Sequence, residues 1–374
     1  MAWAGALAAM LWFALLIVPW RPWRLTERLE AEPEPLNQEE GAGLVTVLMP
    51  ARNEERVIAR SLAALGQQGF SFPVIVIDDG STDATGERAR GVGLPELTIL
   101  SAPELPAGWT GKLWALEQGR VLAATPYVLL LDADILLAPG IVAALLGKAR
   151  RERLALVSLM AAPSMSGFWD RWFMPVFIYF FKLLYPFRLA NTPTSRFAAA
   201  AGGCLLVARD ALADIGGFGA LRGAVIDDCT LAASIKHKAG RSIWVGVTHG
   251  ATMMRETTLR SFWRMVARTA FTQLRYSLLL LIACSVIMVL MFAVPVAGVV
   301  VGDSMVRLTA SLAWFFMAVS YIPTARFYRQ SLWAPWALPA AAVAFLLMTY
   351  TSALWYARGI RSQWKGRTYD RRQA

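Results

Sequence analysis

The sequence predicts an α/β domain with a mostly parallel sheet, flanked by an N-terminal transmembrane anchor and C-terminal transmembrane helices. Two observations predict this fold class. Short apolar, β-branched runs alternate with helix-like stretches between residues 44 and 250, which is the pattern of βαβ units. Long uncharged apolar runs lie outside that region, and they are long enough to cross a bilayer.

The composition of the 374-residue chain averages these two kinds of region. Apolar residues make up 56 %, charged residues 17 %, and the formal net charge is +11, so a disordered chain is excluded. Basic residues flank apolar runs, as Arg21, Arg24 and Arg28 do, which favours an anionic bilayer over nucleic acid as the partner. With three distant cysteines and two histidines, we expect no thiolate zinc site, and any metal should be Mg or Mn held by carboxylates.

Residues 1–22 are predicted to be a transmembrane anchor. The uncharged run 2–20 is just long enough for a helix to span the bilayer core. A signal peptide is disfavoured because the basic n-region and the small-residue cleavage site are missing. Residues 23–43 are predicted to be an acidic linker, which contains Pro33 and Pro35.

Strands and helices are expected to alternate through residues 44–250. The predicted strands are Leu44–Met49, Pro73–Ile77, Leu97–Leu100, Tyr127–Leu131 and Leu154–Leu159. The predicted helices cover residues 54–67, 83–91, 111–123 and 139–151. Because ligands bind at the carboxyl ends of parallel strands, polar residues that follow these strands are the first candidates for a site.

One aromatic stretch inside this region, residues 168–187, is predicted to be an interfacial segment lying on the membrane. A spanning helix is disfavoured because charged residues and a proline interrupt the stretch, namely Asp170, Arg171, Pro175 and Lys182. A buried core helix is the alternative. Residues 251–276, which are rich in arginine, are predicted to be a basic amphipathic juxtamembrane segment.

Residues 277–357 are predicted to form transmembrane helices. The uncharged runs 277–301 and 335–357 are long enough to span. The run 308–323 is shorter, and it either spans, is re-entrant or lies at the membrane interface. Three spans would place the basic tail, residues 358–374, outside, against the positive-inside rule, so the sequence leaves both topologies open.

Two neighbouring carboxylates follow the second predicted strand. In residues 74–83, Asp78 and Asp79 precede Gly80 and Ser81. An Asp-Gly pair between apolar runs is also a hairpin signal, but the residues that follow have a helix-start pattern. We therefore favour a ligand site, in which these carboxylates accept hydrogen bonds from a base or a ribose.

A second acidic pair, Asp132 and Asp134, follows another apolar strand. Strand alternation would send both side chains to one side. A divalent cation bridging them to a diphosphate would relieve the repulsion between the two carboxylates. Helix capping by Asp134 ahead of Pro139 is the alternative.

These motifs, in this order, resemble glycosyltransferase family 2, the inverting GT-A enzymes. The segments that are similar to the family are Met49–Glu54, Ile77–Asp83, Gly111–Leu116, Asp132–Asp134, Gly202–Cys204, Gly216–Phe218 and Ile226–Asp228. The resemblance covers roughly residues 44–276 and implies a Rossmann-like nucleotide-diphospho-sugar transferase domain, with residues 44–250 as the catalytic part. The anchor, the Gly-Trp-Thr-Gly-Lys segment and the C-terminal spans are similar to the hopene-associated glycosyltransferases.

The resemblance implies a site for a nucleotide-diphosphate sugar. The residues implied to bind it are Pro50, Ala51, Glu54, Asp78, Asp79, Lys112, Asp132, Arg264 and Arg268. Asp134 and Asp132 would hold the divalent metal, Mg or Mn. Lys112 would act as a point charge near the diphosphate, or be a solvated lysine at a helix start. The family's Gln-x-x-Arg-Trp is incomplete here, and Gln273 with Arg275 competes with the two arginines for its place. Alternatively, these arginines only flank a transmembrane span and have no role toward the diphosphate.

Asp228 is implied to be the general base that takes the proton of the acceptor hydroxyl. Asp227 stands where the family has Glu, so the choice between the two carboxylates stays open, and helix capping is the alternative for either. Gly202 and Gly203 are implied to lie on the acceptor side. His249 is given only a weak role.

The implied function is a membrane-bound inverting glycosyltransferase that moves a single sugar to a lipid hydroxyl, with a hopanoid as the expected acceptor. A polyprenyl-phosphate or other glycolipid or polysaccharide glycosyltransferase is the alternative. A non-catalytic nucleotide-binding scaffold is disfavoured because all three acidic motifs are present. The expected location is the bacterial cytoplasmic (inner) membrane, with several spans and the catalytic domain facing the cytoplasm.

Overall fold

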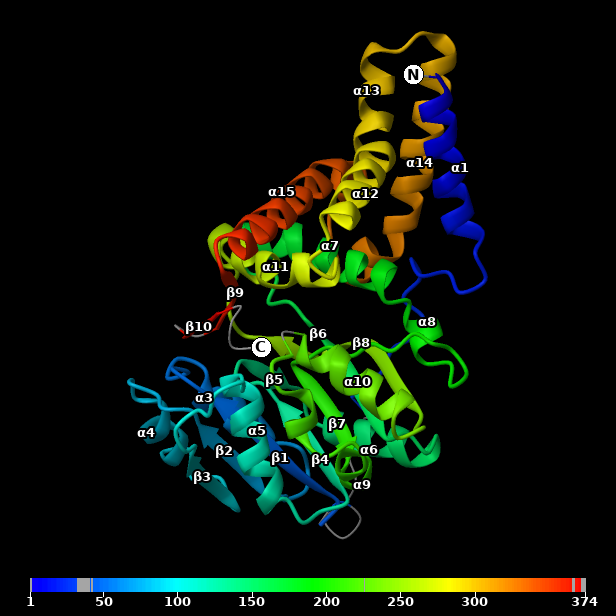
Figure 1. The fold of residues 1–374 in the computed structure, drawn as a ribbon. Coiled ribbons are helices and arrows are strands. Elements are labelled where there is room, and N and C mark those ends of the chain that lie inside the picture. The colour runs from blue at the N-terminus through cyan, green and yellow to red at the C-terminus, as the bar shows by residue number, and fades with distance from the viewer. Residues whose placement is uncertain (1, 32–40, 42, 225, 365–366, 371–374) are drawn as a thin grey trace. The chain divides into compact units, whose positions relative to one another are not determined.

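The computed structural model of the chain describes residues 2–31, 41, 43–224, 226–364 and 367–370. It contains two compact units (Figure 1). The first, called the sheet unit below, consists of Glu27–Ser164 and Phe187–Arg255. The second, called the helical unit, consists of Met1–Thr26, Met165–Pro186 and Glu256–Arg372.

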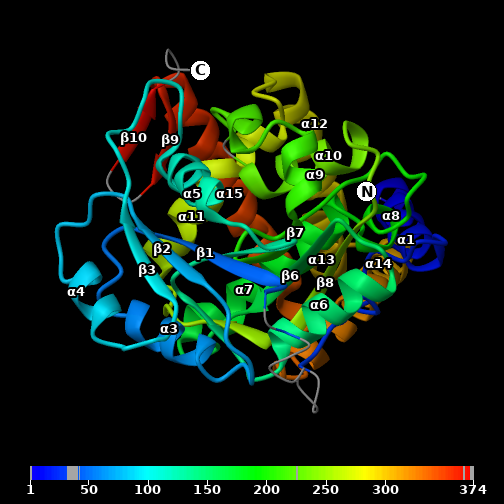
Figure 2. The ribbon, with the colours of Figure 1, turned by 90° about the horizontal axis from the view of Figure 1, so that it is seen from below.

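The sheet unit is built on one eight-stranded sheet in the order β3-β2-β1-β4-β7-β6-β8-β5 (Figure 2). Its strands are β1 Val45–Ala51, β2 Val74–Asp78, β3 Leu97–Ser101, β4 Tyr127–Leu131, β5 Ile135–Leu137, β6 Leu156–Ala162, β7 Cys204–Ala208 and β8 Ile243–Met253. Strands β3, β2, β1 and β4 pair in parallel, as do β6 and β8. The antiparallel pairs all involve β5 or β7, two short strands that the alternating pattern does not predict. The α/β class is confirmed, and the sheet is mixed.

Helices cover both faces of this sheet. They are α3 Ile58–Leu65, α4 Thr85–Arg90, α5 Gly111–Leu122, α6 Ile141–Arg151, α8 Phe187–Ala190, α9 Arg209–Asp214, α10 Asp227–His237 and a 3₁₀ turn at Phe218–Leu221. One apolar cluster joins the sheet to α3 and α6, and a second joins it to α5, α9 and α10. Strand β1 is buried along its whole length, as expected for a strand covered on both faces.

The carboxyl ends of three strands meet at one edge of the sheet. Ala51 pairs with Asp78 in the β1–β2 register, and Leu48 pairs with Leu130 in the β1–β4 register. The antiparallel strand β7 begins at the same edge, where the Asp132 N–H donates to the Gly203 carbonyl at 3.0 Å. This register brings the polar segments that follow β1, β2 and β4 together with the glycines that precede β7.

The helical unit consists mainly of helices, most of which are apolar, whereas α11 carries three arginines. The helices are α1 Ala2–Ile17, α7 Phe168–Leu184, α11 Leu259–Gln273, α12 Leu278–Met288, α13 Val294–Val301, α14 Ser304–Phe327 and α15 Leu338–Ala357. A π-helical turn at Val289–Ala293 joins α12 to α13, and a 3₁₀ turn at Ala334–Ala337 leads into α15. Three continuous stretches are long and apolar enough to cross a membrane, Leu278–Val301, Ser304–Phe327 and Ala334–Ala357.

Helix α14 is longer than the apolar run 308–323 that lies within it. The Asp303 carboxylate accepts hydrogen bonds from the Met305 and Val306 N–H groups at 3.0 and 2.9 Å, so the helix begins at Ser304. Its 24 residues rise about 36 Å, which exceeds the roughly 30 Å of a bilayer core. Its length therefore permits a full span.

Helix α1 is shorter than the predicted anchor. It ends at Ile17 after 16 residues, and these rise about 24 Å, less than the roughly 30 Å core. The buried Trp12 indole donates to the Met291 carbonyl at 2.8 Å, which fixes α1 against the π-helical turn. The anchor over residues 1–22 stays a prediction, with a helix shorter than expected.

Helix α7 groups with the helical unit and not with the sheet unit. The charges that interrupt its sequence are satisfied within that unit, since Asp170 accepts the Thr257 N–H at 2.9 Å and the Lys182 ammonium donates to the Arg24 carbonyl. Phe173 stacks on Phe262 of α11 with ring centroids 5.0 Å apart. One face of α7 is therefore buried against other helices, as the core-helix alternative expected, and its interfacial position stays a prediction.

The predicted linker and tail are described only in part. Of residues 23–43, residues 32–40 and 42 lie outside the described residues. Residues 27–31 run beside β8, where Arg28 forms a parallel bridge with Val247. Of the tail 358–374, residues 365–366 and 371–374 lie outside the described residues, and β9 Ile360–Trp364 pairs antiparallel with β10 Arg367–Asp370.

Candidate active site

The Asp78–Asp79 pair lies in a strand-to-helix turn. Gly80 has φ +69°, a left-handed conformation that suits glycine, and the Asp78 carboxylate accepts the Ser81 N–H at 2.9 Å. Because β3 pairs in parallel with β2, the hairpin alternative is wrong. Asp79 is buried, and the Arg52 guanidinium donates to its carbonyl and lies 3.9 Å from its carboxylate. A role for Asp78 or Asp79 in binding a base stays a prediction.

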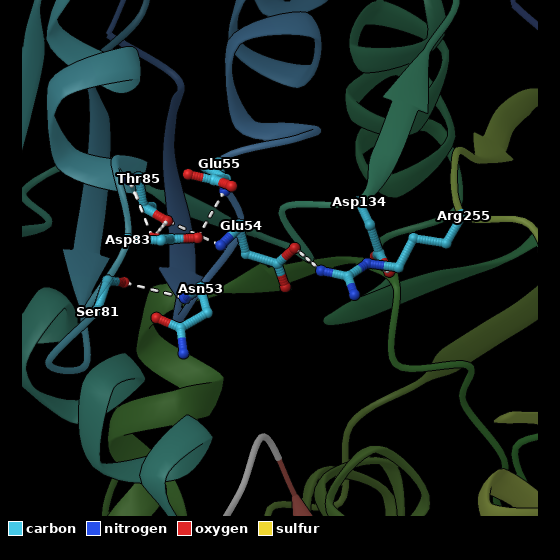
Figure 3. Close-up of polar contacts among 8 residues, drawn as sticks. All are labelled: Asn53, Glu54, Glu55, Ser81, Asp83, Thr85, Asp134 and Arg255. Carbon is cyan, nitrogen blue, oxygen red and sulfur yellow. Dashed lines mark hydrogen bonds and ion pairs between the residues drawn. The ribbon is translucent and has the colours of Figure 1, made fainter.

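A network of hydrogen bonds fixes the loop after β1 (Figure 3). The backbone N–H groups of Asn53, Glu54 and Glu55 donate to side chains of the loop after β2, namely Ser81 Oγ at 3.0 Å, Thr85 Oγ1 at 2.7 Å and Asp83 Oδ2 at 3.2 Å. Pro50 and Ala51 are buried within β1. Their position in the sheet sets where this loop starts, and the loop in turn orients Glu54.

Lys112 joins four segments at the carboxyl edge of the sheet. Its Nζ lies 2.7 Å from Asp132 Oδ1, which follows β4, and 3.9 Å from Asp227 Oδ2, which begins α10. It also donates to the Gly202 carbonyl, ahead of β7, at 3.5 Å. Burial alone would lower the pKa of Lys112, but the neighbouring carboxylates raise it above the ordinary value. Lys112 is thus a permanent cation in the site, and the solvated-lysine alternative is wrong.

Asp228 lies beside this cation in the first turn of α10. Its Oδ1 accepts the Cys229 N–H at 2.8 Å. Burial and then the charge of Asp227 raise the pKa of Asp228 to about 7. A cavity at this point is lined by Lys112, Gly202, Asp227 and Asp228 together with apolar side chains. The arrangement places a carboxyl group that titrates near neutrality next to a fixed positive charge.

The two glycines before β7 have different surroundings. A Cβ atom on Gly202 would lie 3.3 Å from Asp228 Oδ2 and 3.6 Å from Lys112 Nζ, so glycine keeps the space beside both groups open. A Cβ atom on Gly203 would instead meet the Ile135 side chain at 3.1 Å. Gly202 therefore borders the cavity, whereas Gly203 allows close packing. The acceptor-side roles of both stay predictions.

Asp132 and Asp134 lie beyond the end of β4, in a turn closed by the Ile135 N–H and the Asp132 carbonyl at 3.0 Å. The strand alternation used to predict a shared side therefore does not apply to them. Asp132 contacts Lys112, whereas Asp134 Oδ2 lies 3.2 Å from Arg255 Nε. Helix α6 has Gly140 as its N-cap residue, so the capping alternative for Asp134 is wrong.

The donor set of the acidic pair fits a metal that also binds the substrate. Among the described residues, no three His, Cys, Asp or Glu side chains gather as a metal site. Mg²⁺ is commonly bound by one or two carboxylates together with substrate phosphates. Asp134, whose side chain is partly exposed, is suited to such a role, with Asp132 as the second expected ligand.

Arg255 is a site residue that the sequence pattern does not single out. It follows β8, and its guanidinium pairs with both Glu54 and Asp134 (Figure 3). The Met254 N–H also donates to the Asp134 carbonyl at 2.8 Å. A lone arginine directly after an apolar strand was the available signal. His249, by contrast, lies within β8 and contacts Glu30.

The basic residues proposed to replace the family's Gln-x-x-Arg-Trp belong to the helical unit. Arg264 and Arg268 lie on α11. Gln273, at the end of the same helix, accepts the Tyr185 hydroxyl hydrogen bond at 2.6 Å, and Arg275 follows with φ +51°. Their roles toward a diphosphate stay predictions.

A buried lysine fastens the chain that leads to Gly202. The Lys236 ammonium of α10 donates to four backbone carbonyls at 2.6 to 3.5 Å, those of Leu189, Ala190, Thr192 and Phe197. It thus ties α8 and the segment that follows it to the helix that begins with Asp227.

Lys236→Met should lower the free energy of unfolding by about 2–4 kcal/mol, because it removes charge-assisted hydrogen bonds and leaves buried carbonyls unpaired. Trypsin cleavage after the exposed Arg196 should become faster, and thermal unfolding measures the loss. Lys238→Met, two residues on and exposed, is the matched control and should change neither. Equal behaviour of the two variants would contradict the fastening role.

Comparison with known proteins identifies the kind of domain that bears this site. Residues 46–216 match the family model described as Glycosyl transferase family 2. The chain contains a glycosyltransferase family 2 domain. This match includes Glu54, Lys112, Asp132, Asp134 and the two glycines before β7, and it ends before Asp227.

Curated relatives are similar to part of this chain. The chain is 37 % identical over 91 residues to 4,4'-diaponeurosporenoate glycosyltransferase of Staphylococcus aureus, which covers 24 % of either protein. The chain thus matches about a quarter of the length of its curated relatives.

A solved structure shares its fold. The mannosyltransferase PcManGT from Pyrobaculum calidifontis, in complex with GDP-Man and Mn²⁺, superposes with a TM-score of 0.55 at 19 % identity and covers 94 % of this chain and 99 % of that one. Glucosyl-3-phosphoglycerate synthase from Mycobacterium tuberculosis gives 0.46 at 20 % identity over 67 % and 86 %. The predicted GT-A fold is confirmed.

Proposed function

We propose that the chain is a membrane-bound inverting glycosyltransferase that moves one sugar from a nucleotide-diphosphate sugar to a lipid hydroxyl. The observation that supports this most is the cluster of Asp228, Asp227, Lys112 and Asp132 at the carboxyl edge of the sheet. Ligands of open α/β sheets bind at such an edge, and the cluster combines a carboxylate base with a fixed cation. The family 2 domain makes glycosyl transfer the reaction that this combination serves.

In the proposed reaction Asp228 acts as the base. The acceptor hydroxyl oxygen forms a bond to the anomeric carbon, the bond from that carbon to the diphosphate oxygen breaks, and the hydroxyl proton passes to the Asp228 carboxylate. Because the base and the leaving group lie on opposite faces of the sugar, the configuration inverts. A pKa near 7 suits this role, since a base works best when its pKa lies near the working pH.

Asp134 and Asp132 would hold the divalent metal, Mg or Mn, on the donor side. Such a metal neutralises charge that develops on a departing diphosphate. The Mn²⁺ and GDP-Man in the Pyrobaculum mannosyltransferase support this proposal. We further propose that Glu54, Asp78 and Asp79 contribute to the nucleotide pocket, with Pro50 and Ala51 placing the loop.

We propose a lipid as acceptor because three helices are long and apolar enough to cross a membrane. Among lipids, a hopanoid is the first candidate, on the resemblance to the hopene-associated enzymes. The Staphylococcus relative is named for 4,4'-diaponeurosporenoate, and this name supports an apolar acceptor.

We place the protein in the bacterial cytoplasmic membrane with its sheet unit in the cytoplasm, because arginines gather beside the apolar segments. In this proposal residues 1–22 anchor the chain and α7 lies at the interface. A reporter enzyme fused after Ala374 tests the side of the tail. With the sheet unit in the cytoplasm, three full spans between residues 278 and 357 predict a periplasmic tail whether or not α1 spans, and a cytoplasmic signal would contradict that count.

Transfer itself is tested with the full-length protein in lipid vesicles, a panel of radiolabelled nucleotide-diphosphate sugars and either hopanoids or polyprenyl phosphates. We expect label to enter a lipid in the presence of Mg²⁺ or Mn²⁺. Label in the polyprenyl fraction alone would overturn the hopanoid acceptor. If the folded protein labels no lipid and hydrolyses no donor, the proposed glycosyltransferase activity is overturned.

Asp227→Asn should shift the pH dependence of transfer. The charge of Asp227 raises the pKa of Asp228, so its removal lowers that pKa. Because Asp228 must be deprotonated to act, the rate falls as the pH drops through its pKa, and the acid limb of kcat/KM should move to lower pH. The exposed Asp214→Asn is the control and should leave the limb in place. A limb that moves upward or stays would contradict the coupling.

A further inference from the structure

The geometry points to Arg255 as a resident counter-cation of the donor site. Its guanidinium holds Glu54 and Asp134 together and competes with the divalent metal for the Asp134 carboxylate. The inference rests on the proposed function, because it concerns the metal that Asp134 is proposed to hold.

The contacts of Arg255 define this role (Figure 3). Its Nε lies 3.2 Å from Asp134 Oδ2, and its Nη2 pairs with Glu54 Oε2. One guanidinium therefore bridges carboxylates from two strand ends, Glu54 after β1 and Asp134 after β4. Planar guanidinium groups, with their fixed fork of donors, are suited to such bridging.

The Arg255 guanidinium opposes the binding of a divalent metal at Asp134. It already pairs with Oδ2 of this carboxylate, and a metal ion that approaches a carboxylate oxygen to about 2.0–2.6 Å would share the carboxylate with it. The two cations would repel each other at close range. We therefore expect binding of the metal alone to weaken the pairing of Asp134 with the guanidinium.

The two partners of this ion pair differ in solvent exposure. The Glu54 side chain is 7 % exposed and its N–H is held by Thr85, whereas the Arg255 side chain is 43 % exposed. Arg255 is thus the group able to leave while the carboxylates stay. Once displaced, it needs another anion, and a diphosphate supplies one. Metal and diphosphate should accordingly bind better together than apart.

The test titrates the full-length protein with Mn²⁺ alone, without nucleotide, and follows free Mn²⁺ by electron paramagnetic resonance. Arg255→Gln should bind Mn²⁺ roughly tenfold more tightly than wild type, because one positive charge beside the site is removed. Arg255→Lys keeps the charge and should stay close to wild type. Arg88→Gln, an exposed arginine of α4, is the control for net charge. Adding Asp134→Asn to Arg255→Gln should abolish the gain.

A second titration adds inorganic diphosphate as the anion. It should strengthen Mn²⁺ binding more in wild type than in Arg255→Gln, since the variant has no guanidinium to move. An Arg255→Gln variant that binds Mn²⁺ no better than Arg88→Gln, or a gain that survives Asp134→Asn, would overturn the inference. Thermal unfolding verifies that each variant is folded.

These outcomes separate the inference from the proposed function, because none of them measures sugar transfer. If wild type transfers sugar but Arg255→Gln gains no Mn²⁺ affinity, the counter-cation role is overturned, whereas the proposed glycosyltransferase activity is supported. If Arg255→Gln gains affinity through Asp134 but wild type transfers no sugar to any lipid, the counter-cation role stands and the proposed function is overturned.

Discussion

Asp228→Asn is expected to lower the rate of sugar transfer by about 10²–10⁴-fold, the usual contribution of a general base. The amide cannot accept the hydroxyl proton, yet it has nearly the size of the carboxyl and can still accept the Cys229 N–H. Donor affinity should therefore stay within a few fold of wild type. Transfer is measured with labelled donor, and donor binding by calorimetry on the same preparation.

The control for this variant is Asp214→Asn, an exposed carboxylate of α9, which should keep full activity. Loss of donor affinity in Asp228→Asn would place the residue in the nucleotide pocket instead of on the acceptor side. Undiminished transfer would remove it from the chemistry, and Asp227 would then be the remaining candidate for the base.

Lys112→Met is expected to lower the rate of transfer about as strongly as Asp228→Asn does. Its pH dependence should shift in the direction opposite to that of Asp227→Asn. It leaves Asp132, Asp227 and Asp228 without their shared cation, and we expect transfer to fall by about 10²–10³-fold. The charge of Lys112 lowers the pKa of Asp228, so its removal raises that pKa. The acid limb of kcat/KM should therefore move to higher pH.

Unfolding measurements accompany this variant, because Lys112 and Asp132 are partly buried and removing one partner of such a pair also destabilises the fold. Lys112→Arg keeps the charge and should retain the position of the acid limb even if its rate falls. A limb that does not move in Lys112→Met, or that moves equally in Lys112→Arg, would contradict the electrostatic link between Lys112 and Asp228.

The sequence predicts the parallel half of the sheet because its strands are short runs rich in apolar residues. Strands β1, β2 and β4 are almost entirely buried, whereas the edge strand β3 is partly exposed, and helices with clear patterns separate the four runs. Strands β5 and β7 pair antiparallel with distant strands, and such pairing leaves no local pattern. The packing of α7 is also set by distant parts of the chain, because its charged side chains pair with residues far away in the sequence.

The candidate site likewise depends partly on local sequence motifs and partly on contacts between distant segments. The order of the acidic motifs indicates which residues gather at the carboxyl edge. The pairing of Lys112 with Asp132 and Asp227 depends on three segments that are distant in the chain, and no spacing encodes it. Strand alternation predicts a shared side for Asp132 and Asp134, but β4 ends at Leu131, and in the turn that follows Asp134 contacts Arg255. A lone arginine after a strand gives little signal until the fold brings it to Glu54.

The proposed inverting displacement is tested by the anomeric configuration of the product. Glycolipid made by the full-length protein from a nucleotide-diphosphate sugar is isolated, and the coupling constant of its anomeric proton is measured by NMR. A base at Asp228 opposite the leaving diphosphate predicts a configuration inverted relative to the donor. A product with retained configuration would contradict the single in-line displacement and the role of Asp228 as its base.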